Sequence, residues 1–162
     1  MSSSHKNLSE FEGSAIPDAA KYTFAVIWSE WNLTVTGALK DGAVSFLLKH
    51  GVLKENIIIK SVPGSYELTL GAQYALENTA VDAVITLGCV IQGETRHFDF
   101  ICDAVANGIT HLNIKYNKPV IFGVLTPDTM QQAMDRAGGK HGNKGEEAAA
   151  TAIKMLALRD SF

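Results

Sequence analysis

The sequence predicts an α/β domain in which helices cover both faces of a four-stranded parallel sheet. Four short apolar segments alternate with longer segments that begin at helix-capping residues. Each short segment is apolar almost throughout, which is typical of parallel strands buried on both faces. Right-handed crossovers would place the helices on those faces. With 162 residues, of which 46% are hydrophobic, the chain can bury one substantial core, so we expect one domain.

The first strand is expected at residues 23–28, a compact apolar run. Asn32 is suited to cap a helix over residues 33–50, and Gly51 is suited to end that helix. The β-branched, apolar residues 57–62 predict the second strand. This gives a first strand, helix and strand unit.

The unit then repeats. Pro63 and Gly64 predict a turn, and Ser65 can cap a second helix that continues to about Glu77. Residues 83–90 read as the third strand. The remaining elements are a helix at residues 98–115, a strand at residues 119–125, a short helix from Asp128 or Thr129 to about Arg136, and, after a glycine-rich break, an alanine-rich helix at residues 145–158.

Charge and cysteine content exclude several classes of protein. A formal net charge of −3 argues against a general nucleic-acid binder or a binder of anionic membranes. Cys89 and Cys102 lie in apolar surroundings outside any Cys-x-x-Cys pair, so we expect reduced, buried thiols. The polar first 20 residues lack a signal-peptide core, and no apolar run approaches the ~20 residues of a membrane helix. We expect a soluble cytoplasmic protein without membrane or nucleic-acid partners.

The carboxyl ends of the predicted strands define one candidate pocket. In open parallel sheets, ligands bind beyond these ends. The segments that fall there are residues 29–32, 62–67, 89–97 and 125–128. The third of these segments ends at His97 and precedes a helix, whose free backbone N–H groups suit an anion. An imidazole titrates near neutrality, so His97 is a candidate acid/base, although a lone histidine is more often a helix cap or a core residue.

A second candidate anion site lies between the last two predicted helices. Residues 136–145 combine Arg136, two lysines and four glycines. Arginine presents a planar fork of donors to phosphate oxygens, and glycine lets backbone amides approach. The alternative is a flexible solvated turn, and the spacing is not that of a Walker loop.

Five motifs occur in order along the chain: Glu-Trp-Asn at 30–32, Val-Pro-Gly-Ser-Tyr-Glu-Leu at 62–68, Gly-Cys-Val-Ile-Gln-Gly-Glu-Thr-Arg-His-Phe-Asp at 88–99, Pro-Val-Ile-Phe-Gly-Val-Leu-Thr at 119–126, and Arg-Ala-Gly-Gly through Asn-Lys-Gly at 136–145. Through them, roughly residues 24–158 resemble the lumazine synthase family. The resemblance implies a flavodoxin-like three-layer αβα sandwich. It also implies a transferase that condenses 5-amino-6-(D-ribitylamino)uracil with 3,4-dihydroxy-2-butanone 4-phosphate in riboflavin biosynthesis, releasing phosphate and water, with no cofactor or metal.

The resemblance also implies roles for individual residues. Trp31 would stack on the pyrimidine. The ribityl chain would be bound by Ser65, Tyr66 and Glu67. The edge of the uracil would hydrogen-bond to backbone groups of Cys89, Val90 and Ile91. Glu94, Thr95 and Arg136 would bind the phosphate, and Phe122 would close the aromatic side. His97, Arg136 and Glu147 would be catalytic, Glu147 by orienting or polarising His97. Lys144 and Glu147 would lie near the reacting groups; the alternative for both is a solvated helix start. No nucleophilic role falls to Cys89.

The chain departs from the usual family pattern at two places. Many relatives carry phenylalanine at the position of Trp31, and we expect the larger indole to hold tricyclic flavins better. The usual pattern Ala-Phe-Glu-Leu-Pro is replaced at Ser65, Tyr66 and Thr69, so the side-chain contacts of this wall are left open.

The family assembles into pentameric rings. In some members twelve pentamers form an icosahedral shell, whereas others stop at pentamers or decamers. The resemblance implies that Phe122, Arg136, Lys144 and Glu147 come from the neighbouring subunit. The short link at residues 138–142 favours a shell. Residues 21–162 would form the domain, and residues 1–20 would add a strand to a neighbouring sheet or remain a tail. Riboflavin synthase is a further partner to consider.

Two other classes of function compete with this one. A flavin- or lumazine-binding or shell-forming protein of the same fold would need neither the acid/base His97 nor the phosphate ligand Arg136. A phosphoryl-transfer enzyme is disfavoured, because no Walker loop or evident magnesium-binding carboxylate pair accompanies Arg136.

Overall fold

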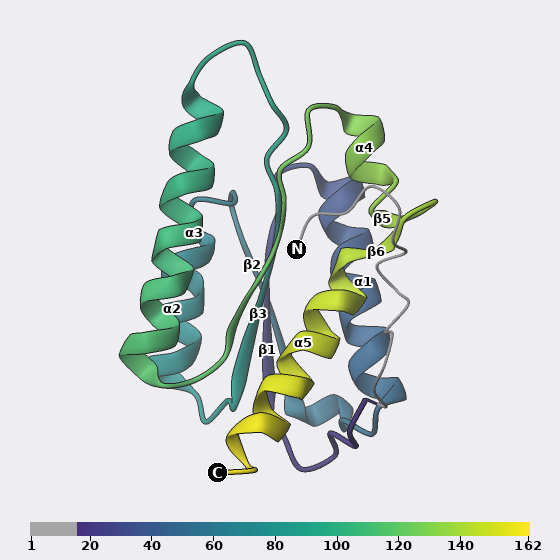
Figure 1. Cartoon of the computed structure of the whole chain (residues 1–162), viewed down its shortest axis with the longest axis vertical. Coiled ribbons are helices and arrows are strands. Elements are labelled where there is room, and N and C mark those ends of the chain that lie inside the picture. The colour runs from purple at the N-terminus through teal and green to yellow at the C-terminus, as the bar shows by residue number, and fades with distance from the viewer. Residues whose placement is uncertain (1–15) are drawn as a thin grey trace.

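Four parallel strands form the central sheet in the order β2-β1-β3-β4 (Figure 1). The computed structural model describes residues 16–162. The strands are β1 (Phe24–Ser29), β2 (Ile57–Val62), β3 (Ala83–Cys89) and β4 (Val120–Leu125). The predicted fold class and all four predicted strands are confirmed, with ends that differ by one residue or not at all.

Helices cover both faces of the sheet, as Figure 1 shows. One layer holds α1 (Leu33–Lys49) and α5 (Lys144–Arg159), and the opposite layer holds α2 (Leu68–Asn78) and α3 (His97–Tyr116). A 3₁₀ turn, η1 (Lys54–Asn56), precedes β2, and the short helix α4 (Met130–Met134) follows β4. The Thr129 side chain caps α4 by accepting a hydrogen bond from the N–H of Gln132, so Thr129 rather than Asp128 opens this helix.

Each central strand is apolar throughout because its side chains alternate between two cores. In β1, Phe24 and Val26 pack with α1 and α5, whereas Ala25 and Ile27 pack with α2 and α3. Successive side chains of a strand point to opposite faces, so a strand covered on both sides must be apolar at every position.

Two predicted helix caps differ from the structure. Asn32 occupies the N-cap position of α1, but its backbone is left-handed at φ 61° and its side chain makes no capping hydrogen bond. The α2 helix begins at Leu68 with Glu67 at the N-cap, so Ser65 does not cap it. In both cases contacts with other parts of the chain override the local preference of these side chains for capping.

The glycine-rich break before α5 is a tight hairpin rather than a loose turn. Its strands are β5 (Ala137–Gly139) and β6 (Gly142–Asn143). Gly138 and Gly142 have φ values of +107° and +79°, which residues with a side chain rarely adopt. The hairpin fixes the path between Arg136 and the first turn of α5.

The residues before β1 pack against their own chain from residue 16 onward. Ile16 contacts the core beneath α1 and α5, and Ala19 is fully buried and donates from its N–H to the carbonyl of His50. Residues 1–15 of the predicted N-terminal segment lie outside the described residues. No helix among residues 16–162 is long and apolar enough to cross a membrane.

Both cysteines are free thiols. Cys89 is buried and Cys102 is half-buried, so only the first matches the predicted burial. Burial raises the pKa of the Cys89 thiol to about 11. A thiol with this pKa is protonated near neutral pH, which is consistent with no nucleophilic role.

Candidate active site

A cavity of about 620 Å³ opens at the carboxyl ends of β1, β2 and β3. The chain runs from β1 to its neighbour β2 on one side and later from β3 to β4 on the other, so the sheet order reverses between β1 and β3. Crevices at such switch points are the usual ligand sites of open α/β sheets. The cavity therefore lies at the sheet edge where the sequence predicted a pocket, but residues 125–128, the fourth predicted segment, do not line it.

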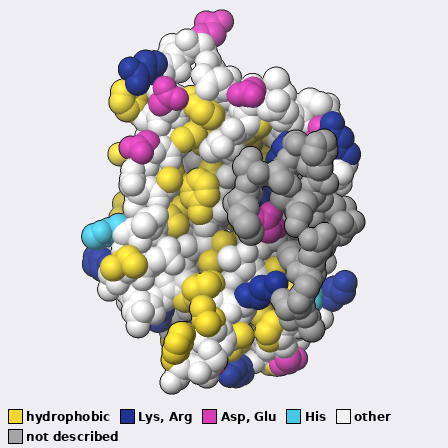
Figure 2. Space-filling model, viewed as in Figure 1, with side chains coloured by type: hydrophobic (Ala, Val, Ile, Leu, Met, Phe, Trp, Pro, Cys, Tyr) yellow, Lys and Arg dark blue, Asp and Glu magenta, His cyan; other side chains and the backbone are white. Residues whose placement is uncertain are grey.

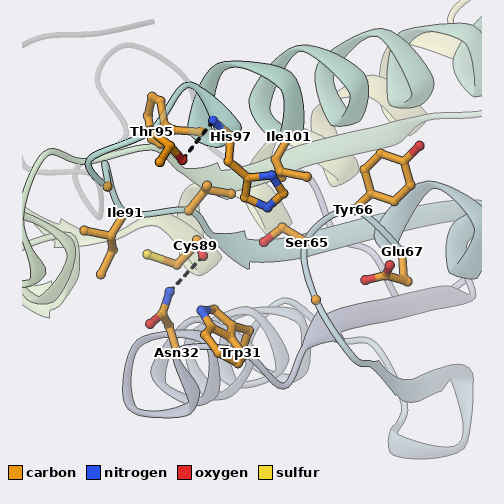
Figure 3. Close-up of a pocket in the computed structure, with 14 residues that line it drawn as sticks. Trp31, Asn32, Ser65, Tyr66, Glu67, Cys89, Ile91, Thr95, His97 and Ile101 are labelled. Atoms are coloured by element: carbon orange, nitrogen blue, oxygen red, sulfur yellow. Dashed lines mark hydrogen bonds between the residues drawn. The ribbon is translucent and has the colours of Figure 1, made fainter.

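The loop after β1 supplies Trp31 and Asn32 to the cavity. The indole of Trp31 is 71% exposed, which leaves one wall aromatic and open to a planar ligand. Asn32 donates from Nδ2 to the carbonyl oxygen of Cys89 at 3.0 Å, which ties this loop to the end of β3 (Figure 3). Reasoning from sequence missed this brace, since it depends on a partner 57 residues away.

The loop after β2 supplies Ser65, Tyr66 and Glu67, as predicted for the wall that binds a polyol. Ser65 is buried, whereas Tyr66 and Glu67 are exposed. The carbonyl of Ser65 accepts a hydrogen bond from the N–H of Leu68 at 3.2 Å. This turn places three polar side chains immediately before the start of α2.

The end of β3 forms the floor of the cavity through Cys89, Val90 and Ile91. The N–H of Val90 donates to the carbonyl of Leu125 at 2.8 Å, so this amide is already used within the protein. Backbone groups of all three residues were predicted to hydrogen-bond the edge of the uracil. At Val90, only the carbonyl is left for that contact.

The loop before α3 brings Thr95 and His97 to the cavity, together with Gly93. The N–H of His97 donates to Thr95 Oγ1 at 3.4 Å, and His97 is the first residue of α3. Figure 3 shows the imidazole on the opposite side of the pocket from Trp31. Phe98 and Ile101 also line the cavity, and sequence reasoning missed both, although Ile101 shares a helix face with His97.

Five predicted site residues do not line this cavity within one chain. Glu94 is exposed in the loop before α3, and Phe122 on β4 is 38% exposed. Arg136 donates from Nη1 to the carbonyl of Gln132 at 3.3 Å. Lys144 and Glu147 form an ion pair at 2.7 Å in the first turn of α5.

Among the described residues, no lysine or arginine lines the cavity, and its one carboxylate is Glu67. The loop N–H groups near Thr95 can bind an anion, but a phosphate ester also requires a cation to balance its charge. Within residues 16–162, no group of three or more His, Cys, Asp and Glu side chains is arranged to hold a metal ion.

This fold and cavity define an α/β protein with a site for a small ligand that is part aromatic and part polar. Residues 21–160 match the family model for 6,7-dimethyl-8-ribityllumazine synthase. The chain belongs to this family. It is 62% identical over 157 residues to the 6,7-dimethyl-8-ribityllumazine synthase of Cytophaga hutchinsonii, covering 97% of this chain and 98% of that protein.

Two other relatives bear the same name and match over nearly their whole length. The protein of Parabacteroides distasonis is 53% identical over 156 residues, covering 96% of this chain and 98% of the relative. The protein of Phocaeicola vulgatus is 48% identical over 162 residues, covering 100% of this chain and 96% of the relative. The resemblance read from the five motifs is confirmed.

Proposed function

We propose that the cavity beside β1 and β3 is the active site in which this enzyme makes 6,7-dimethyl-8-ribityllumazine. The reaction is the penultimate step of riboflavin biosynthesis, a condensation of 5-amino-6-(D-ribitylamino)uracil with 3,4-dihydroxy-2-butanone 4-phosphate. The observation that carries the assignment is that one cavity gathers Trp31, the turn at residues 65–67, the floor at residues 89–91, Thr95 and His97.

The proposed binding mode follows the shape of the cavity. The pyrimidine stacks on Trp31, with its edge against residues 89–91 and its ribityl chain along residues 65–67. The phosphate lies near Thr95, where loop amides precede α3. Glu94 is proposed to contribute only its backbone N–H, since its side chain is exposed.

His97 is the proposed acid/base. The amine attacks the ketone, water leaves to form an imine, phosphate is eliminated, and the second amine closes the ring before the last water leaves. Each step moves a proton, and an imidazole at the cavity wall can accept and return one. His97→Ala is expected to slow turnover moderately with less effect on binding, since aligning two reactive partners supplies much of the acceleration.

The absence of a cation among the described lining residues supports a shared active site. Phe122, Arg136, Lys144 and Glu147 are proposed to complete the cavity of a neighbouring subunit, with Arg136 on the phosphate and Glu147 orienting His97. Figure 2 shows hydrophobic side chains in a band between the two helical layers, on the face crossed by the edge strand β4. An exposed apolar sheet edge of this kind is suited to association.

We propose a pentameric ring, and twelve pentamers as a shell, in the cytoplasm. The shell is proposed from the family resemblance, since extra residues at the 138–142 link separate the pentamers of some relatives and the hairpin here is short, with strands at Ala137–Gly139 and Gly142–Asn143. Riboflavin synthase is a candidate partner. Light scattering and electron microscopy of the purified protein test the assembly.

The shared site has a direct test by mixing two variants of reduced activity. His97→Ala and Arg136→Ala chains are purified separately, unfolded, mixed in equal amounts and reassembled. If the two residues meet across subunits, about a quarter of the sites in a randomly mixed ring carry both native side chains, and lumazine formation rises accordingly. If both residues act within one chain, no site is restored, and the mixture has the average activity of its parents.

The rival function is binding of flavin or lumazine without turnover. Purified protein is mixed with both substrates while lumazine fluorescence and free phosphate are followed. Formation of both products faster than in the protein-free mixture supports the enzyme, and an unchanged rate supports the binding protein.

A further inference from the structure

β1 and β3 separate at their carboxyl ends, and this separation opens the active-site cavity. Their last paired residues are Trp28 and Leu87. β1 still pairs with β2 as far as Ser29 and Val62, and β3 continues to Cys89. The loop after β1 therefore leaves β3 while it stays beside β2. A contact across this opening would fix how far apart its two sides lie.

The loop after β1 is held on both sides of the opening, by different kinds of hydrogen bond. On the β2 side, the N–H of Trp31 donates to the carbonyl of Pro63 at 3.2 Å. On the β3 side, the contact is made by a side chain, since Asn32 Nδ2 donates to the carbonyl of Cys89 at 3.0 Å. Figure 3 shows the Asn32 amide pointing from the loop that carries Trp31 toward Cys89. Asn32 thus joins the aromatic wall of the cavity to its floor.

The backbone of Asn32 suits this contact rather than the capping of α1. Among the described residues, the non-glycine residues with positive φ are Asn32 at 61° and Asn117 at 48°. Asparagine enters this left-handed region more readily than most residues, but the conformation is still uncommon. Asn32 stands at the N-cap of α1, yet its side chain makes no capping hydrogen bond. An uncommon conformation that gives up a cap and gains a contact across the cavity indicates a functional constraint.

We propose that Asn32 is a positioning residue, which fixes Trp31 relative to the floor at residues 89–91 and so sets the affinity for the pyrimidine. The inference rests on the proposed function, in which the ring stacks on Trp31 while its edge meets that floor. Both contacts form together only if the wall and the floor keep a set separation. A displacement of about 1 Å can cost an enzyme on the order of 100-fold in rate. Asn32 acts on the ligand through these neighbours.

The test removes the hydrogen bond without straining the backbone. Asn32→Gly deletes the side chain at a position where φ is positive, a conformation that glycine adopts freely. The matched control is Asn117→Gly, which makes the same change at the other left-handed asparagine. Asn117 follows the 20 residues of α3, so it lies about 30 Å along that helix from the cavity.

The two substrates are expected to respond differently to Asn32→Gly. The KM for 5-amino-6-(D-ribitylamino)uracil should rise by roughly 3- to 10-fold, and the KM for the butanone phosphate should stay within about 2-fold of the native value. Asn117→Gly should leave both KM values unchanged. A role in stability alone would lower the apparent kcat through loss of folded enzyme and leave both KM values as they are. Equal KM changes for the two substrates, no KM change in Asn32→Gly, or the same change in Asn117→Gly would overturn the proposal.

A second variant keeps the experiment decisive if Asn32→Gly folds poorly. Asn32→Asp has nearly the same shape, and a carboxylate is favourable at the N-terminus of α1. An ionised carboxylate cannot donate to the Cys89 carbonyl, so the KM for the uracil substrate should rise by at least roughly 3-fold. A native KM in Asn32→Asp would refute the role of the hydrogen bond.

A double-mutant cycle with Trp31→Ala tests whether Asn32 acts through the indole. A Trp31→Ala protein has no indole to position, so adding Asn32→Gly to it should raise the KM for the uracil substrate by less than about 2-fold. An undiminished effect in that background would contradict the positioning role. A native protein that forms no lumazine from the two substrates refutes the proposed function itself, whereas an active native protein with unchanged Asn32 variants refutes only the role of Asn32.

Discussion

Replacing Gly145 by alanine is expected to destabilise the protein strongly, because α1 and α5 approach each other closely at this residue. A Cβ atom at Gly145 would lie 1.9 Å from the carbonyl oxygen of Leu39 and 2.9 Å from Asn143 Oδ1. The first contact is with backbone, so relief requires the two helices to separate by about 1 Å or more over a core of small residues such as Ala149. Overpacking a core typically costs about 1–3 kcal/mol, and we expect a loss of about 3 kcal/mol here.

Gly37 provides a matched control within α1. A Cβ atom there would have no heavy atom within 4 Å, and the residue is helical. Gly37→Ala should therefore stabilise the protein by about 0.5–1 kcal/mol through helix propensity alone. Both variants are unfolded in urea at one protein concentration, because association adds to apparent stability. A Gly145→Ala protein as stable as the native one would refute the reasoning about the helix contact.

Three further outcomes are expected. Arg136→Ala should raise the KM for the butanone phosphate by roughly 10- to 100-fold, through loss of a charge-assisted contact, and change the KM for the pyrimidine little; equal effects on both would contradict its phosphate role. Trp31→Phe should weaken riboflavin binding by about 0.5–1.5 kcal/mol in a fluorescence titration, whereas equal affinities would show that the indole adds nothing. A hydrogen bond from Lys21, with others including one from Tyr22, holds the pKa of Asp160 well below its usual range. That stabilisation is present above the unfolded-state pKa of ~3.9 and is lost as pH falls, so Asp160→Asn should be less stable at neutral pH, with a gap that closes in acid unfolding experiments; a gap independent of pH would contradict this coupling.

The fold class could be predicted because burial on two faces leaves a plain pattern in the sequence. Phe24 and Ile27 face different cores, yet both must be apolar, so β1 reads as a continuous hydrophobic run. The caps could not be predicted equally well. Asn32 and Ser65 have side chains that favour helix starts, but the Asn32 side chain donates to the carbonyl of Cys89 and the Ser65 hydroxyl packs against Gly88. These contacts depend on the tertiary fold, which local propensity does not encode.

The candidate site could likewise be predicted in part from the sequence. Residues at the ends of β1, β2 and β3 meet because parallel strands bring their carboxyl ends to one edge, so Trp31, Glu67 and His97 were predicted to lie together and do line one cavity. Arg136 and Lys144 belong to a different part of the chain surface. The sequence of one chain does not show which residues of two neighbouring chains come together. The place of Arg136 and Lys144 in the site therefore depends on the family resemblance and on the proposed assembly.

Asn143 shows how one subunit could hold the residues it offers to another. Its Nδ2 donates to the carbonyl of Ala38 at 3.0 Å, and its Oδ1 accepts from the N–H of Gly145 at 2.8 Å. These bonds tie the hairpin and the start of α5 to α1. The carbonyl of Arg136 accepts from the N–H of Lys144 at 2.8 Å, which fixes the backbone between the two cations. Under the proposed assembly, the backbone that carries Arg136 and Lys144 is therefore ordered before subunits meet, so association loses less conformational entropy and can complete the neighbouring cavity by rigid docking.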